Sequence, residues 1–465
     1  MTQPTSSPST GTTPGQDFGR RLARVKTIAA VLIVVVAIAA GTIGYELHPA
    51  STSSSSKNVS LTYFDDLAPS ESSYMTATVL PAFEAQYPNI TVVYSNLAAG
   101  NIVTEVEALV NGHDVGTTVI AEDNLVIGEL VYGGYLMNMS SIASTFEPTT
   151  MIPSMAGIAN YELKAFGGTY FVPLRANVPL FWYNASALSA AGISAPPTTL
   201  AQLTSDAQTL AAAHGNIGQL MFQGHGGAST PTELFQWLTQ FGGNPMLFNN
   251  AGDLQAFQYL YNLSAYFNPG YTQGYWGTYT GLTNGAYAMV DYQWPYIYSD
   301  LLSLGMTNSE IGVYPGPSGP VNSDHLIGGD VLAMPKGESN VWAAEQFSHY
   351  LLSTPVQQGF IENLSWPAVN AAAYNGLNAT TLKVYGPLEQ AIQNPVFRPP
   401  VAWIGEWQTI MDNVWTTIIV NHASYASIQG TLNSANQQLD SYLSTNYGSA
   451  VATAYEQGAY GPLIV

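Results

Sequence analysis

The stretch VSLTYFDDLAPSESSYMTATVLPAFEAQYPNITVVYS, residues 59–95, decides the fold class. Its first run, 59–64, is rich in aromatic and β-branched residues and predicts a strand. Residues 72–88 show a helical pattern that begins with serines suited to capping, and 90–95 predict a second strand. A further helix at 101–112 and a third strand that ends near residue 121 repeat the order. Strands that alternate with helices in this way predict an α/β fold.

Short polar loops follow these predicted strands. In open α/β sheets, ligands bind beyond the carboxyl ends of the strands. That topology makes the loop side chains candidate binding residues, namely Asp65, Asp66, Asn96, Glu122, Asp123 and Asn124. Each of them would also suit the N-cap or first turn of the next helix, so a structural role stays open for each.

Charge is scarce and one-sided. Only 9% of the 465 residues are charged, whereas about 25% is usual. Beyond residue 58 there are five basic and 28 acidic residues, a formal charge of −23. Such a balance excludes nucleic acid as a partner. Because carboxylates lose their charge near pH 4, this part would carry only a modest positive charge in strong acid, which suggests an acidophile, with an ordinary secreted acidic protein as the alternative.

The N-terminal region carries a membrane signal. Residues 27–45, TIAAVLIVVVAIAAGTIGY, are uncharged and close to the length of a bilayer-spanning helix. The basic run RRLARVK precedes them, which predicts a flexible cytoplasmic tail at 1–26 and an extracellular domain after the helix. We expect 27–46 to be an uncleaved single-pass anchor in the cell membrane, with a cleaved secretion signal as the alternative, and 47–58 to be a Ser-rich linker.

Two further patterns concern the cell compartment. Cysteine is absent, which excludes disulfides, thiolate metal sites and cysteine nucleophiles. Asn-x-Ser/Thr sequons agree with an extracellular glycoprotein, although several must arise by chance in a chain so rich in Asn and Ser. They begin at Asn58, Asn89, Asn138, Asn184, Asn262, Asn363 and Asn378.

Four stretches occur in the order AEDNLVIGELVYGGYLMNMSS (121–141), GGTYFVPLRANVPLFWYNASALSAAGISAPPTTLAQLTSDAQTLAA (167–212), GLTNGAYAMVDYQWPY (281–296), and GGDVLAMPKGESNVWAAEQFSHYLLSTPVQQGF with LSWPAVN (328–370). Over roughly residues 59 to 440, the chain resembles the extracellular solute-binding proteins of ABC importers, typified by the maltodextrin-binding proteins. The second stretch is the most specific of the four.

The resemblance implies a two-lobed periplasmic-binding-protein-like fold of type II, in which each lobe is a β-sheet flanked by helices. A multi-stranded hinge would join the lobes, and one N-terminal transmembrane helix would precede them. The implied parts are lobe 1 at 59–174 and 322–374, lobe 2 at 175–321 and 375–447, and a C-terminal tail at 448–465. The hinge crossings would lie near Pro173–Asn177, Tyr314–Pro320 and Ala371–Asn378.

The resemblance also implies binding positions between the lobes. A hydroxyl-rich ligand is held by aromatic rings against its C–H faces and by amides and carboxylates at its hydroxyls. The matching positions are Arg175, Asn177, Gln223, His225, Asp291, Gln293, Trp294, Asp330, Trp366, Trp403, Glu406 and Trp407. Each tryptophan could instead belong to a core, and Arg175 could be a structural ion-pair partner. The chain departs from the family in its mostly neutral site groups and in its N-terminal helix, which replaces a lipid-modified cysteine and points to an archaeal-type or unusual anchor.

The function implied is that of a monomeric extracellular subunit of an ABC-type importer, which closes on a sugar or oligosaccharide and delivers it to a membrane permease. A polyol, peptide or metal chelate is an alternative ligand. The chain contains no GxSxG, HExxH or P-loop string, and its histidines lack zinc-ligand spacing, so we predict no catalytic residue, metal or cofactor. Two other classes stay open. One is a glycoside hydrolase that pairs Glu122 or Asp123 with Asp330 or Glu406, and the other is a cell-surface adhesion module.

Overall fold

The computed structural model describes residues 58–146, 151–273 and 277–464. The predicted cytoplasmic tail (1–26), the predicted anchor or signal (27–46) and nearly all of the predicted linker lie outside the described residues. Among the helices that are described, none combines the length and the apolar character needed to cross a membrane.

The predicted alternation of strands and helices builds a first sheet. Strands β1 (Val59–Asp65), β2 (Ile90–Asn96) and β3 (Thr117–Asp123) run parallel, so their carboxyl ends meet at one edge. Strand β10 (Asp330–Ala333) returns from far along the chain and pairs antiparallel with β3 and with β4 (Phe171–Pro173). The order is β2-β1-β3-β10-β4. β3 is buried along almost its whole length because the central strands of such sheets are covered on both faces.

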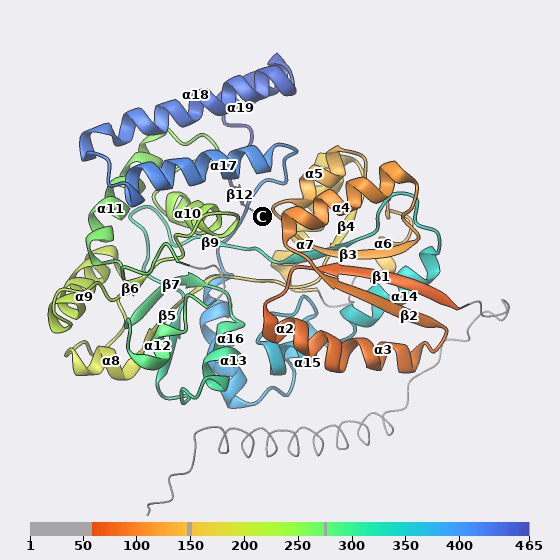
Figure 1. Ribbon diagram of the computed structural model, residues 1–465, viewed down its shortest axis with the longest axis horizontal. Helices are drawn as coiled ribbons and strands as arrows, with labels where there is room; N and C mark the ends of the chain where they lie inside the picture. Colours follow the sequence, from red (N-terminus) through yellow and green to blue (C-terminus); the bar gives the residue numbers. More distant parts are fainter. Residues whose placement is uncertain (1–57, 147–150, 274–276, 465) are drawn as a thin grey trace, which may run out of the picture. The chain divides into compact units, whose positions relative to one another are not determined.

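The helices around this sheet are α2 (Pro69–Tyr74), α3 (Leu80–Gln86), α4 (Ala99–Gly112), α5 (Ile127–Tyr132), α6 (Ala143–Phe146), α7 (Pro153–Phe166), α14 (Val341–Leu352) and α15 (Thr354–Leu364). Sheet and helices together are termed lobe 1, on the right in Figure 1. The helix predicted at 72–88 is instead α2 and α3, joined by a π-helical turn at Met75–Val79. Pro81 lacks an amide hydrogen, so it cannot make the regular helical bond, and the backbone widens before it.

A second sheet comes from the middle of the chain, in the order β6-β7-β5-β8. Its strands are β5 (Leu180–Asn184), β6 (Leu220–Met221), β7 (Met289–Gln293) and β8 (Ile311–Tyr314). β5 pairs antiparallel with β7 and β8, and β6 pairs parallel with β7. This sheet and its helices are termed lobe 2, on the left in Figure 1.

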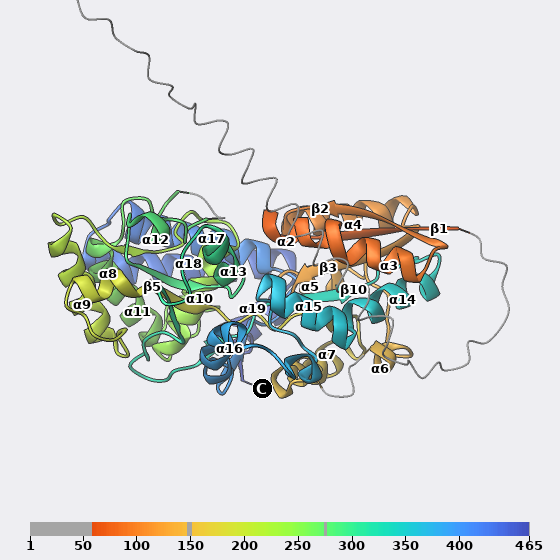
Figure 2. The same ribbon diagram turned by 90° about the horizontal axis from the view of Figure 1, so that it is seen from below.

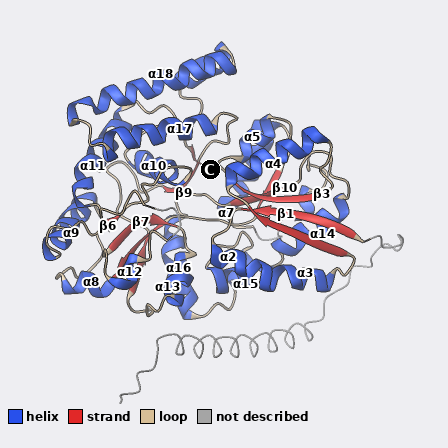
Figure 3. Cartoon of the chain, viewed as in Figure 1, coloured by secondary structure: helices blue, strands red, loops and turns tan. Residues whose placement is uncertain are grey.

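Helices surround the second sheet as they do the first, as Figure 3 shows by colour. They are α8 (Ala185–Ala190), α9 (Leu200–Ala213), α10 (Ser229–Gln240), α11 (Ala251–Leu263), α12 (Gly281–Asn284), α13 (Ile297–Ser303), α16 (Ala379–Ala391), α17 (Ile404–Trp415) and α18 (Ile428–Asn446). Short helical turns occur at Ser264–Tyr266, Thr416–Val420 and Tyr425–Ser427. Helix α10 is buried along its whole length, so its polar side chains need internal partners.

Several segments pass between the two sheets. The chain runs from β4 to β5 through residues 174–179, from β8 to β10 through 315–329, and from a 3-10 turn at Ala371–Tyr374 into α16, which packs on β5 and β8. Isolated antiparallel β-bridges join the backbone of Arg175 to Ala368 and that of Asn177 to Gly328. A small third sheet joins β9 (His325–Leu326), β11 (Pro395–Phe397) and β12 (Leu463–Ile464). The residue boundaries given above for the two lobes remain a proposal.

Residues 448–464 do not form the predicted tail. They form helix α19 (Ser449–Glu456), which packs on α18, and then strand β12, which pairs with β11. Tyr455 is completely buried and accepts a hydrogen bond from Asn436 of α18. Burial of this apolar side makes the C-terminal segment part of the fold, and Figure 2 shows this segment reaching the lower edge of the view between the two lobes.

Candidate functional site

A hollow of about 350 Å³, part of it open to solvent, lies where the carboxyl end of β3 faces lobe 2. Asp123, the last residue of β3, forms its lobe 1 side. The lobe 2 side comes from the loop before α10, the first turns of α10 and the end of β7. The lining residues are Asp123, Pro179, Gln223, Ala228, Ser229, Thr232, Glu233, Tyr292 and Trp294. This hollow is termed the crevice.

Trp294 supplies the indole ring of the crevice. It directly follows β7, is partly buried and belongs to the lining. The ring lies against Gly328 in the segment between β9 and β10, where an added Cβ atom would be 2.8 Å from the ring. Glycine at 328 therefore permits the backbone to approach this ring closely.

Arg398, which was not among the residues predicted from the sequence, joins the two sides of the crevice. Its Nη2 donates to Asp123 Oδ1 at 2.7 Å and to Asn124 Oδ1 at 2.8 Å, while its Nη1 donates to Thr232 Oγ1 at 2.7 Å. The arginine side chain is completely buried, whereas the Asp123 side chain is 31% exposed. Arg398 is one of only five basic residues beyond residue 58, and that rarity in an acidic chain was an available signal.

Two buried carboxyl groups stand behind the lobe 2 side. Glu233 of α10 and Asp291 of β7 lie within hydrogen-bonding range of each other. Gln293 Nε2 donates to Glu233 Oε1 at 2.5 Å and to Gln223 Oε1 at 2.7 Å, and Trp237 Nε1 donates to Asp291 Oδ2 at 3.4 Å. Burial and the charge of Asp291 raise the pKa of Glu233 well above its usual value, and burial does the same to the pKa of Asp291. Glu233 was not predicted, although a lone carboxylate in the run STPTELFQWLTQ was a signal.

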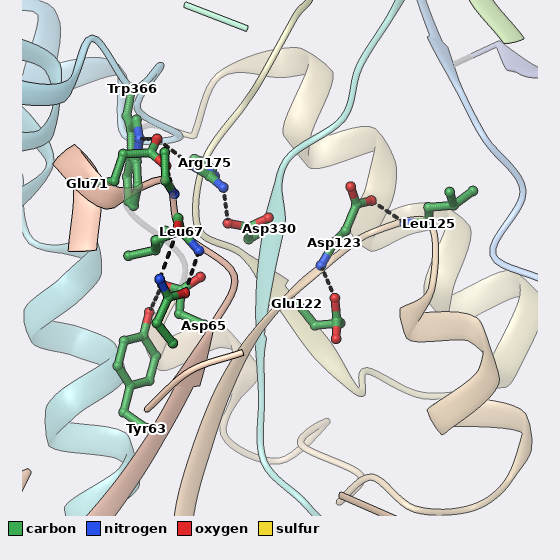
Figure 4. A network of polar contacts seen from close by, with 12 residues as sticks. Tyr63, Asp65, Leu67, Glu71, Glu122, Asp123, Leu125, Arg175, Asp330 and Trp366 are labelled. Carbon is green, nitrogen blue, oxygen red and sulfur yellow. Dashed lines mark hydrogen bonds and ion pairs between the residues drawn. The ribbon is translucent and has the colours of Figure 1, made fainter. Parts of the chain in front are cut away.

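A second polar cluster lies inside lobe 1 and is drawn in Figure 4. Asp330 of β10 pairs in register with Asp123 of β3. Arg175 forms ion pairs with Asp330 through Nη2 at 2.5 Å and with Glu71 through Nη1 at 3.2 Å, and its guanidinium carbon is 4.2 Å from the ring centre of Trp366. The indole nitrogen of Trp366 also donates to Glu71. Of the two roles left open for Arg175, these contacts show the structural ion pair.

Burial dominates the protonation of this cluster. It raises the pKa of Asp330 to about 7 despite the opposing charge of Arg175. Burial, together with the charge of Asp330, raises the pKa of Asp65 well above its usual value, and Asp65 Oδ2 accepts a 2.5 Å hydrogen bond from the hydroxyl of Tyr63. Burial alone would lower the pKa of Arg175, but Asp330 and Glu71 outweigh it, so the cation is retained.

The other predicted tryptophans are core residues. Trp407 is 0% exposed and donates its indole hydrogen to the Pro245 carbonyl at 3.0 Å. Trp403 is 3% exposed and packs edge-on against the rings of Tyr455 and Tyr460. Trp366 is enclosed beside Arg175. Of the four predicted tryptophans, only Trp294 therefore lines the crevice.

The remaining predicted residues also lie outside the lining, each with a local role. Glu122 is buried and accepts from the amide of Asp123 at 2.8 Å, and Asn96 clamps both backbone groups of Leu67. Asp66 is half-buried directly after β1, and the backbone carbonyl of Asn177 accepts a hydrogen bond from the Gly328 amide. His225 is exposed and contacts the Thr272 carbonyl. Glu406 is half-buried on α17 beside Gln438.

Another hollow, of about 340 Å³, has Arg398 in its lining. Its remaining lining residues are Asn124, Tyr161, Phe171, Phe397, Pro400 and Leu463. Most of these are apolar, and the side-chain oxygen of Asn124 is already bonded to Arg398. It therefore offers a polar solute fewer hydrogen-bonding groups than the crevice does, and the crevice is the better candidate site.

The lining determines what the crevice can bind. No basic side chain is among the lining residues, and the nearby Arg398 and Arg175 are paired with carboxylates. Such a lining suits an uncharged solute, because the ring of Trp294 can cover a C–H face while neutral hydrogen-bonding groups surround it. The hydrolase pairing finds little support in this geometry, since among its four candidate acids only Asp123 lines the crevice.

Residues 68–358 match the family model described as bacterial extracellular solute-binding protein. An uncharacterised ABC transporter extracellular-binding protein of Pyrococcus horikoshii is 28% identical over 120 residues, which cover 26% of this chain and 27% of that protein. The match to this curated relative therefore spans about a quarter of its length.

Solved structures share the fold over most of the chain. The GacH receptor of Streptomyces glaucescens, solved unliganded and with acarbose, has a TM-score of 0.71 at 20% identity and covers 82% of this chain and 98% of its own. Maltose-bound MalE3 of T. maritima has a TM-score of 0.71 at 19% identity, with coverage of 82% and 100%. A substrate-binding protein of Listeria monocytogenes in complex with cycloalternan reaches 0.70 at 16% identity, with coverage of 83% and 99%. At these identities the likeness shows the two-lobed α/β fold.

Proposed function

We propose that this chain, which belongs to the family of bacterial extracellular solute-binding proteins, captures an uncharged sugar, oligosaccharide or polyol for an ABC-type importer. The observation that carries the proposal is the crevice, in which Asp123 of lobe 1 faces Gln223, Glu233 and Trp294 of lobe 2. A ring, amides, hydroxyls and carboxyl groups without a lining cation match a neutral polyhydroxylated solute. The maltose, acarbose and cycloalternan named for the solved structures support a carbohydrate.

Capture would proceed by closure of the two lobes. Because the lining comes from both lobes, a bound solute contacts Asp123 and Trp294 together only when the lobes approach, so it favours the closed state by differential affinity. The closed form would then dock on the permease in the membrane. The predicted helix at 27–46 would keep the binding domain at the outer surface of the cell, which membrane fractionation of the full chain and of a chain lacking 27–46 can test.

The binding experiment uses calorimetric titration of the purified protein with maltose, mannotriose, ribitol and glucuronate at pH 3 and pH 7. We expect saturable binding of at least one neutral solute and weaker binding of glucuronate. Trp294→Ala should lower the affinity by about 1–3 kcal/mol if the ring stacks on the solute. Trp342→Ala is the matched control, because Trp342 is 49% exposed on α14 and lies outside the lining. Absence of saturable binding for every neutral solute would refute the proposal.

A further inference from the structure

Glu233 has an environment unlike that of the other carboxyl group in the crevice. Asp123 is 31% exposed and is paired with Arg398. Glu233 is 3% exposed, and its oxygens accept hydrogen bonds from two amides: the Gln293 side chain at 2.5 Å and the Gln223 backbone at 3.3 Å. A buried carboxylate without a cation is costly, so Glu233 has to lower its charge in another way.

The neighbouring carboxyl group of Asp291 can lower the charge of Glu233. The two carboxyl groups lie within hydrogen-bonding range of each other, and two acids can form an oxygen–oxygen hydrogen bond only when one of them carries a proton. Oδ1 of Asp291 is completely buried and receives no N–H or O–H donor from the described residues. A proton held between Glu233 and Asp291 would provide the missing donor and would leave the pair with one negative charge instead of two.

The surrounding elements offer little charge to offset a second ionisation. Arg398 reaches the preceding residue of the same helix, Thr232, but is paired with Asp123 across the crevice. Tyr292 adjoins Asp291 on β7, and burial raises the pKa of its hydroxyl, so it stays neutral. His325 of β9 faces Tyr292, and burial lowers its pKa, which also keeps it neutral. On α17, which packs on α10, burial raises the pKa of Asp412 to about 6.

We infer that Glu233 and Asp291 share one proton and that this protonated pair makes the crevice specific for neutral hydroxyl-bearing solutes. The inference rests on the proposed function, since it assigns the chemistry of the same site. Through Gln293 the pair also fixes Gln223, because Gln293 Nε2 bonds both Glu233 and the Gln223 side-chain oxygen. Loss of the shared proton would put two negative charges side by side in the buried lobe 2 side of the crevice. These charges would disturb the hydrogen bonds of Gln293 and repel any anionic solute.

The expected pH dependence has a definite sign. The pKa of each acid is raised by burial, so the shared proton is retained to higher pH than the proton of an exposed carboxyl group and is lost as the pH rises further. Solute affinity should therefore be constant while the proton is bound and should fall as pH rises through its loss. If one proton is linked to binding, the fall is at most about tenfold per pH unit.

The test has one arm that needs no solute. Infrared spectra of the purified full chain at pH 7 should contain a protonated-carboxyl band that weakens in both Glu233→Gln and Asp291→Asn. In the second arm, calorimetric titrations with maltose and mannotriose from pH 4 to pH 9 should lose their pH dependence in Glu233→Gln. Asp253→Asn is the matched control. Asp253 is another buried carboxyl of lobe 2, with a pKa raised by burial to about 8, but it bonds the Asn250 amide and lies outside the lining.

The outcomes separate this inference from the proposed function. The inference is overturned if neither substitution changes the protonated-carboxyl band, or if Glu233→Gln keeps the wild-type pH dependence. It is supported if the band and the pH dependence are lost together while Asp253→Asn keeps the latter. If no neutral solute binds the wild-type chain at any pH, the proposed function fails, whereas the infrared arm still reports on the pair. Because two isosteric single variants carry that arm, misfolding of one leaves the other to decide.

Discussion

Replacement of Arg398 with glutamine tests whether a single guanidinium ties the two lobes together. The change removes hydrogen bonds to Asp123, Asn124 and Thr232, of 2.7, 2.8 and 2.7 Å. Removing one partner of a buried ion pair costs about 3–5 kcal/mol. Because Asp123 is 31% exposed, water can hydrate the carboxylate that is left behind, so we expect the lower end, about 3 kcal/mol of unfolding free energy.

The assay is urea unfolding followed by tryptophan fluorescence, with calorimetric titration of maltose on the same preparations. Arg398→Lys keeps the charge but loses the planar fork, so it should fall between wild type and Arg398→Gln. Lys336→Gln removes the same formal charge from an exposed side chain and serves as the control. A loss below about 0.5 kcal/mol in Arg398→Gln, which is the range of an ordinary surface change, would refute the bridge.

Three other substitutions probe neighbouring contacts. Gly328→Ala would place a methyl group 2.8 Å from the ring of Trp294, so calorimetry should show weaker solute binding by about 1–3 kcal/mol, whereas Gly100→Ala, which meets open space, should not. Glu129→Ala removes the carboxylate that accepts a hydrogen bond from the Gly405 amide at 2.9 Å. Because this bond caps the start of α17, urea unfolding should show a loss of about 1 kcal/mol in unfolding free energy. Asp253 has a pKa raised by burial from 3.8 to about 8, so the folded chain binds this proton more tightly than the unfolded chain. Unfolding free energy should therefore fall as pH rises from about 4 to about 8, and Asp253→Asn should flatten that slope when unfolding is measured at several pH values.

Local patterns predicted the three parallel strands of the first sheet, β1, β2 and β3, but not β4 or β10. The strand expected at 59–64 is Val59–Asp65, because adjacent residues alone decide such a periodicity. The segment after residue 447 could not be predicted in this way. Helix α19 has only eight residues, and an isolated helix of that length is not stable in water. It forms because it buries Tyr455 against α18, a contact that no local pattern encodes.

The site was predictable only where topology or a family segment marks a position. Asp123 follows from the rule on strand ends, and Trp294 follows from the segment that contains it. Residue type alone does not separate Trp294 from Trp407, because both are large apolar rings and only packing shows which of them is enclosed. Arg398 was missed because its partner Asp123 is 275 residues away in the sequence.

The segment around Arg398 also changes how lobe closure should be understood. It contacts lobe 1 at three points: through the Arg398 bonds to Asp123, through the Gly405 amide to Glu129, and through Pro400, which leaves no space for a side chain at Gly128. Since one guanidinium is within hydrogen-bonding distance of both Asp123 and Thr232, a change in the distance between these two residues has to break a bond to Arg398. Opening should therefore be a rotation about the segment around Arg398 that moves Trp294 away from Asp123, and not a uniform separation of the lobes.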